Sequence, residues 1–132
     1  MDTIQTKAWM EAFYQALKAR DARATVSLFS EDSTYEIVDP FEEWTDYGLI
    51  LRGRSEYYDW LEGYFAGFER WRVFEYEILS SKPGQEIGHL RVYWNNSSSN
   101  EQLGCDMIHL ATLDSSNLCT SLRDWSRVRS RD

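Results

Sequence analysis

The chain has 132 residues, with 22 acidic against 14 basic side chains and a formal net charge of −8. This length fits one domain, spanning residues 1–132, that buries about two-thirds of its unfolded surface. The negative charge repels phosphate backbones and anionic lipid, so neither nucleic acid nor a membrane is an expected partner. Aromatic residues make up 15% of the chain, which indicates either a ring-rich core or a pocket lined with rings.

Sequence features that mark a compartment, a metal or a cofactor are sparse. Cys105 and Cys119 do not make a disulfide framework, no leader sequence precedes the first expected helix, and no apolar run reaches the roughly twenty residues that span a bilayer. A cytoplasmic protein is therefore expected. The two histidines lack zinc-ligand spacing, and the chain has neither a glycine-rich phosphate loop nor a serine-hydrolase elbow, so no metal and no cofactor is expected.

The first half of the chain is predicted to contain three helices and one strand. Residues 4–20 and 55–71 carry apolar and aromatic side chains at three- and four-residue spacing, which predicts two long amphipathic helices. A shorter helical stretch at 22–30 leads to a strand at 34–39. The segment 40–55 is predicted to be a loop, because it combines a proline, two glycines and a cluster of acids.

The second half changes to a hydrophobic period of two, which is typical of strands. Four strands separated by polar turns are expected at 72–80, 87–95, 101–114 and 118–128. Helices followed by a run of strands predict an α+β fold. We expect a cone-shaped, curved antiparallel sheet with three helices of the N-terminal half packed on its concave face.

One polar side chain interrupts an otherwise apolar strand face. The face of the 101–114 strand that is predicted to point inward is apolar or soft except for His109. If residues 115–116 form the tip of a two-residue hairpin, His109 lies opposite Leu122 and diagonal to Asp124, which permits a His–Asp pair.

Two alternatives to this pair stay open at the level of the sequence. A one-residue slip or a bulge would bring Arg123 or Trp125 to the inner face in place of Asp124. His109 is equally explained as a core histidine with a backbone or aspartate partner, because buried polar groups must be paired whatever their role.

Tyr14 and Asp39 are two further candidates. Tyr14 flanks the apolar stripe of the first helix, where its ring can pack while its hydroxyl reaches polar neighbours; alone, it is also explained as a core residue. Asp39 lies at a strand end, on the same predicted strand face as Tyr35 and Ile37. Its carboxylate either starts a turn or points into a cavity as a base.

Four segments carry a resemblance to a known family: AFYQALKARDARATVSLFSEDSTYE, VDPF, LRGRSEYYDWL and LRDWSRV. With the order of elements, they resemble the nuclear transport factor two-like superfamily, in particular its SnoaL-like and ketosteroid isomerase-like branch. The resemblance spans nearly the whole chain. This superfamily includes isomerases, cyclases, dehydratases, epoxide hydrolases and non-catalytic binders, so the fold alone does not choose a reaction.

The resemblance to ketosteroid isomerases implies roles for individual residues. Asp39, in the Asp-Pro-Phe step, matches their general base, and Tyr14 matches a helix-one tyrosine that donates to the oxyanion. Their second donor, a protonated aspartate, falls at His109, and their cavity tryptophan on the last strand is similar to Trp125. A two-residue lengthening before Asp39 makes Glu36 the alternative base.

These features predict cofactor-free acid–base chemistry on a small, hydrophobic, carbonyl-bearing molecule that is polyketide- or steroid-like: isomerisation, cyclisation or dehydration. Asp39 would take the proton next to the carbonyl, Tyr14 and His109 would stabilise the enolate oxygen, and Asp124 would orient His109. The predicted pocket residues are Tyr35, Trp44, Phe65, Trp94 and Trp125. The alternative is a non-catalytic ligand-binding or dimerisation module, and the resemblance itself implies a homodimer.

Overall fold

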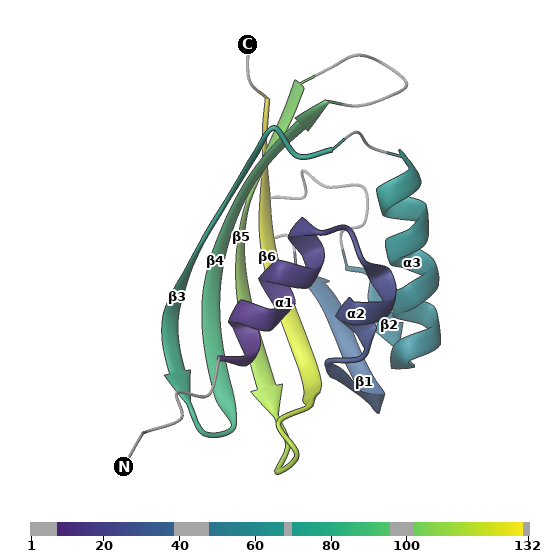
Figure 1. The fold of residues 1–132 in the computed structure, drawn as a ribbon, viewed down its shortest axis with the longest axis vertical. Coiled ribbons are helices and arrows are strands. Elements are labelled where there is room, and N and C mark those ends of the chain that lie inside the picture. The colour runs from purple at the N-terminus through teal and green to yellow at the C-terminus, as the bar shows by residue number, and fades with distance from the viewer. Residues whose placement is uncertain (1–7, 39–47, 68–69, 96–101, 131–132) are drawn as a thin grey trace.

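Three helices pack on the concave face of a curved six-stranded sheet in the computed structural model, which describes residues 8–38, 48–67, 70–95 and 102–130 (Figure 1). The elements in chain order are α1 (Trp9–Lys18), α2 (Ala22–Val26), β1 (Phe29–Val38), β2 (Ile50–Arg52), α3 (Gly53–Gly67), β3 (Val73–Lys82), β4 (Gln85–Asn95), β5 (Gln102–Leu113) and β6 (Cys119–Ser130). The predicted α+β architecture is confirmed. Within the described ranges, no helix is both long enough and apolar enough to cross a membrane.

The sheet is mixed, which corrects the prediction of a wholly antiparallel sheet. Its strand order is β2-β1-β6-β5-β4-β3, and the β1–β6 pair is parallel while the other neighbouring pairs are antiparallel. Strand patterns in the sequence locate each strand but do not report which distant strands pair, so this neighbour could not be read from periodicity. The parallel pair brings the inner face of β1 beside the inner face of β6.

The segment between the first two long helices contains more strand than expected. β1 begins at Phe29 rather than at residue 34, and its register against β6 shifts between Phe29 and Thr34. The polar residues of this irregular stretch, which include exposed Glu31 and Asp32, hid the strand. The short strand β2 pairs with β1 at the sheet edge inside a segment predicted to be a loop.

Helix α1 is held on the sheet at its N-terminus. Ala8, the residue before the helix, provides no side-chain cap. The carboxylate of Glu86 on β4 accepts hydrogen bonds from the backbone nitrogens of Met10, at 2.7 Å, and Trp9, at 3.2 Å. A carboxylate at this position satisfies free amide groups and complements the positive end of the helix dipole. A residue far along the chain therefore fixes where α1 starts.

A glycine lets α1 approach β4 closely. A Cβ atom at Gly88 would lie 2.5 Å from the hydroxyl oxygen of Tyr14 and 2.7 Å from Cγ of Met10, and real Cβ contacts are essentially never so short. Gly88 is also the cross-strand partner of His109. The absence of a side chain at this position allows the Tyr14 ring to lie against the histidine.

Candidate active site

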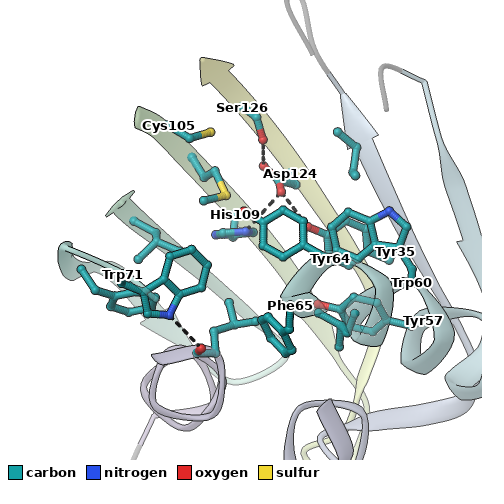
Figure 2. A pocket seen from close by; sticks show the side chains of 16 residues that line it. Tyr35, Tyr57, Trp60, Tyr64, Phe65, Trp71, Cys105, His109, Asp124 and Ser126 are labelled. Carbon is teal, nitrogen blue, oxygen red and sulfur yellow. Dashed lines mark hydrogen bonds and ion pairs between the residues drawn. The ribbon is translucent and has the colours of Figure 1, made fainter. Parts of the chain in front are cut away.

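An aromatic pocket lies between α3 and the inner face of the sheet (Figure 2). Its volume is about 40 Å³, which is room for a small fragment rather than for the whole of a drug-sized ligand. Most of the wall consists of rings, contributed by Tyr35, Tyr57, Trp60, Tyr64, Phe65, Trp71 and Phe74. The polar part of the wall is His109 on β5 with Asp124 and Ser126 on β6.

Asp124 is the centre of the polar wall. It is 2% exposed, and both of its carboxylate oxygens accept hydrogen bonds. The Tyr35 hydroxyl donates to Oδ2 at 2.6 Å, and the Ser126 hydroxyl donates to Oδ1 at 2.5 Å. Nε2 of His109 lies 3.5 Å from Oδ2. Tyr35 reaches Asp124 because β1 and β6 run parallel and side by side.

These contacts keep Asp124 ionised. Burial would raise the pKa of the Asp124 carboxyl, because the charged form loses its water. The electrostatic interaction with His109 and the hydrogen bonds from Ser126 and Tyr35 act in the opposite direction and outweigh it, so the pKa lies below its ordinary value. Among the described residues that line the pocket, Asp124 is the one carboxylate.

His109 connects Asp124 to helix α1. Its Nδ1 lies 2.9 Å from the hydroxyl oxygen of Tyr14, and its Nε2 faces Asp124. Burial, followed by the charge of Asp124, raises the pKa of Tyr14 far above its ordinary value, so Tyr14 keeps its proton. A neutral His109 that carries its proton on Nε2 accepts a hydrogen bond from the Tyr14 hydroxyl at Nδ1, whereas an imidazolium donates from both nitrogens.

The structure brings three predicted residues, Tyr14, His109 and Asp124, into one row of polar contacts, but with a different strand register. His109 pairs directly with Asp124, and Leu122 pairs with Ala111. The predicted register placed Leu122 opposite His109, which is corrected here. Because the shift is by two residues, the inward parity of the face was right although the partner was wrong.

The loop between β5 and β6 explains the shift. Asp114 accepts hydrogen bonds from the backbone nitrogens of Ser116 and Leu118, and Asn117 has a φ of 62°, so the connection is longer than a two-residue hairpin. The register also shifts between Thr112 and Leu113 in their pairing with β6. A loop and a bulge together move the partner of His109 along the strand.

The predicted pocket residues fall into different places. Tyr35 and Phe65 line the pocket. Trp94 is fully buried behind it, packed against Tyr64 and Trp71, and is not part of its wall. This placement corrects the prediction for Trp94.

Trp125 lies on the other face of the sheet, which corrects a second prediction. It alternates with Asp124 along β6, and the guanidinium of Arg123 lies 5.0 Å from its ring centroid. The strand keeps its alternation at this point, so Asp124 and Trp125 cannot both face the pocket. The alternative base Glu36 also points away, toward Arg123, with Nε and Oε1 3.3 Å apart.

Two predicted site residues, Asp39 and Trp44, lie outside the described residues. Two other residues were missed by the sequence reading. Ser126 follows Asp124 at a spacing of two on the same strand face, and Tyr57 begins the apolar stripe of α3. Burial, followed by the charge of Asp124, raises the pKa of Tyr57, so its hydroxyl stays protonated as a hydrogen-bond donor in the pocket wall.

No group of three or more histidine, cysteine, aspartate or glutamate side chains that could hold a metal ion occurs in the described ranges. Cys105 and Cys119 are buried free thiols in this fold.

The polar wall of the pocket consists of a carboxylate, an imidazole and hydroxyl groups. Such a set of groups is suited to proton transfer.

Comparison with known proteins identifies the family. The SnoaL-like domain family matches residues 10–82, which is more than half of the chain. The chain belongs to the SnoaL-like domain family. No protein with a curated description matches this SnoaL-like chain in sequence.

Solved structures share the fold. A protein with a ketosteroid isomerase-like fold from Catenulispora acidiphila, in complex with trimethylamine, superposes with a TM-score of 0.70 at 19% identity, covering 92% of this chain and 86% of that one. A Mycobacterium tuberculosis protein in complex with estradiol-17β-hemisuccinate gives 0.70 at 14% identity, with 89% of each chain covered. SalBIII, an epoxide hydrolase/cyclase-like enzyme of pyran ring formation in the polyether salinomycin, gives 0.69 at 12% identity, with 93% of each covered. At these identities the likeness concerns the fold alone.

Proposed function

We propose that this SnoaL-like chain is a cofactor-free acid–base enzyme for a small hydrophobic, carbonyl-bearing molecule, and that Asp124 is its base. The observation that carries the proposal is the state of Asp124: a buried, ionised carboxylate in the wall of an aromatic pocket. An ionised carboxylate can accept a proton, and its fixed position in the pocket wall allows it to do so when a substrate carbon–hydrogen bond is aimed at it.

In the proposed reaction one proton moves from the substrate to Asp124 and later returns to the substrate. Oδ1 of Asp124 accepts one hydrogen bond, from Ser126, and a carboxylate oxygen can accept two, so Oδ1 can receive the proton next to the substrate carbonyl. The electron pair of the broken C–H bond moves to the carbonyl oxygen and forms an enolate. Return of the proton from Asp124 to another carbon completes an isomerisation. In a cyclisation the enolate carbon attacks a second carbonyl, and the proton returns from Asp124 to the alkoxide oxygen that forms there.

The neighbouring residues have separate roles in this mechanism. Tyr57, a protonated hydroxyl in the pocket wall, donates to the enolate oxygen. His109 and Tyr14 act as positioning residues, because both ring nitrogens of His109 face protein groups. Asp39 is outside the described residues, and its role as a base stays a prediction.

Two structural relatives support the substrate class. One is a cyclase-like enzyme of polyether formation, and another binds an estradiol ester. Both ligand classes are largely apolar, which suits a wall made mainly of rings. The rival proposal is a non-catalytic binding module. It requires the same aromatic pocket, but it does not require an ionised carboxylate at Asp124.

Proton exchange tests the proposal without knowledge of the natural product. The protein is incubated with 2-tetralone in D2O, and loss of the proton signals next to the carbonyl is followed by NMR. We expect wild-type protein to accelerate exchange and Asp124→Asn to lose about a hundredfold or more of that acceleration, as for removal of a general base. Asp106→Asn, on the outer face, is the matched control and should exchange at the wild-type rate.

Binding of 2-tetralone without accelerated exchange in wild-type protein would favour the non-catalytic module. Accelerated exchange that survives Asp124→Asn would remove Asp124 from the mechanism while leaving an enzyme.

We also propose a homodimer, which the family resemblance implies, and a cytoplasmic location, which rests on the sequence features alone. Ile108 on the outer face of β5 is 37% exposed and pairs across the sheet with Trp125, which supports an apolar patch on that face. Light scattering after size-exclusion chromatography tests the dimer, and a molar mass of one chain would exclude it at the concentration used.

A further inference from the structure

Four basic side chains line a second, larger cavity that adjoins the aromatic pocket. They are Lys18, Arg20, Arg70 and Arg72, and we call this cavity the basic groove. Trp71 and Phe74 line both the basic groove and the aromatic pocket. The groove has a volume of about 660 Å³ against about 40 Å³ for the pocket, so it has room for the part of a ligand that the pocket cannot hold.

The sign of the charge in the basic groove is opposite to that of the chain. The chain carries a net charge of −8, yet no acidic residue is among the described residues that line this groove. The negative end of the α1 dipole accounts for Lys18 in its last turn. It does not account for Arg70 and Arg72, which come from the segment before β3.

Like charges converge in the basic groove at a cost. Burial, followed by the charge of Arg70, lowers the pKa of Arg20. Two guanidinium groups that repel each other are stabilised when an anion binds between them, and arginine offers paired N–H groups that match a carboxylate or a phosphate. The electrostatics of the groove therefore favour an anionic ligand group.

Arg20 fixes the basic groove to the wall of the aromatic pocket. Its guanidinium donates a hydrogen bond to the backbone oxygen of Phe65 and lies 5.3 Å from the ring centroid of Phe65 and 5.8 Å from that of Trp71. Phe65 and Trp71 are both pocket residues (Figure 2). A ligand that enters the pocket past Trp71 thus meets positive charge at the position where it leaves the apolar wall.

We propose that the basic groove binds an anionic group, a carboxylate or a phosphate, on the same molecule whose apolar part enters the aromatic pocket. The substrate class is then an apolar carbonyl compound that bears an anionic substituent. This inference rests on the proposed function, because it assigns the second half of the ligand that the pocket receives.

Matched ligands test the basic groove by isothermal titration calorimetry. The probes are 2-naphthylacetate, the neutral 2-naphthylethanol with the same ring and chain length, and acetate as the anion alone. We expect 2-naphthylacetate to bind about tenfold tighter than the alcohol, which corresponds to about 1.4 kcal/mol. Added salt should reduce that preference, since the contact lies at the surface.

Arg70→Gln should remove most of the preference for 2-naphthylacetate and leave binding of the alcohol unchanged. Lys82→Gln is the matched control, because Lys82 is exposed at the end of β3, outside the groove, and loses the same charge. It should behave as wild type.

Three other results would contradict different parts of this proposal. Equal affinity for acid and alcohol overturns the basic groove and leaves the proposed function standing. Acetate that binds as tightly as 2-naphthylacetate shows an anion site independent of the pocket and overturns the single-ligand proposal. If neither naphthyl compound binds, the pocket and the basic groove both fail as ligand sites.

Discussion

Two His–Asp pairs with the same separation lie on opposite faces of the sheet. Nε2 of His109 is 3.5 Å from Oδ2 of Asp124 on the inner face, and Nε2 of His89 is 3.5 Å from Oδ1 of Asp106 on the outer face. The inner side chains are 1% and 3% exposed, and the outer ones are 32% and 18% exposed. The same two side chains at the same distance therefore differ mainly in their access to water.

The surroundings give the inner pair its chemistry. Asp124 takes hydrogen bonds from neutral hydroxyls inside a ring-lined pocket, whereas Asp106 also lies 3.2 Å from the guanidinium of exposed Arg91. Coulomb interactions near water are weakened several-fold compared with those in the interior. A histidine next to an aspartate is thus not a site by itself; burial in a pocket wall makes the difference.

The largest expected effect compares the two aspartates. Asp124→Ala should lower the free energy of unfolding by about 3–5 kcal/mol, because it leaves a buried histidine and two hydroxyls without their acceptor. Asp106→Ala should cost at most about 1 kcal/mol, as for a solvent-exposed pair. Urea denaturation measures both, and equal costs would contradict the distinction between the faces.

A glycine on each face gives a second comparison. In Gly88→Ala the new methyl group collides with fully buried Tyr14 and Met10, and we expect a loss of about 1–3 kcal/mol, as for overpacking. In Gly104→Ala the methyl group meets the ring of Tyr93, which is only half-buried and can turn aside, so the cost should stay below about 1 kcal/mol.

Thermal unfolding of these two alanine variants provides the test. A larger loss for Gly104→Ala than for Gly88→Ala would show that α1 can move off β4 and that the Tyr14–His109 contact is not fixed by close packing.

The smallest of these effects concerns two tyrosine hydroxyls. Tyr14→Phe removes the hydrogen bond to His109 in the core and should cost about 1–2 kcal/mol, since a buried ring nitrogen loses its partner. Tyr76→Phe removes contacts to Glu11 and Gln15 near the surface and should cost about 0.5 kcal/mol or less. Chemical denaturation at neutral pH distinguishes them, and equal values would mean that the His109 contact contributes no more than a surface one.

Local patterns in the sequence predicted most of the fold. The three helices and the four strands of the second half follow periods that depend on neighbouring residues alone. Two features depend on contacts between distant segments and could not be predicted: the parallel pairing of β1 with β6, and the strand β2. β2 has only three residues, which are too few to show a hydrophobic period. The irregular start of β1 at Phe29 hid a strand among polar residues.

The sequence predicted the part of the site that depends only on which face of a strand each side chain occupies. An inward His109 and an inward Asp124 follow from alternation, which a two-residue change of register leaves intact. Trp125 could be assigned to the pocket only by analogy, against that same alternation. Ser126 had the right parity but carries a common hydroxyl side chain, so its bond to Asp124 became evident only from the fold.

The ionisation of Asp124 is the central claim, and the pH dependence of its 13Cγ chemical shift measures it most directly. Because the electrostatic interaction with His109 and the hydrogen bonds to the carboxylate outweigh burial and lower the pKa of Asp124, we expect a carboxylate signal at neutral pH and a titration below the ordinary range of an aspartate. Asp124→Asn identifies the signal by its disappearance. A carboxyl signal that is protonated at pH 7, or that titrates near neutrality, would contradict the account.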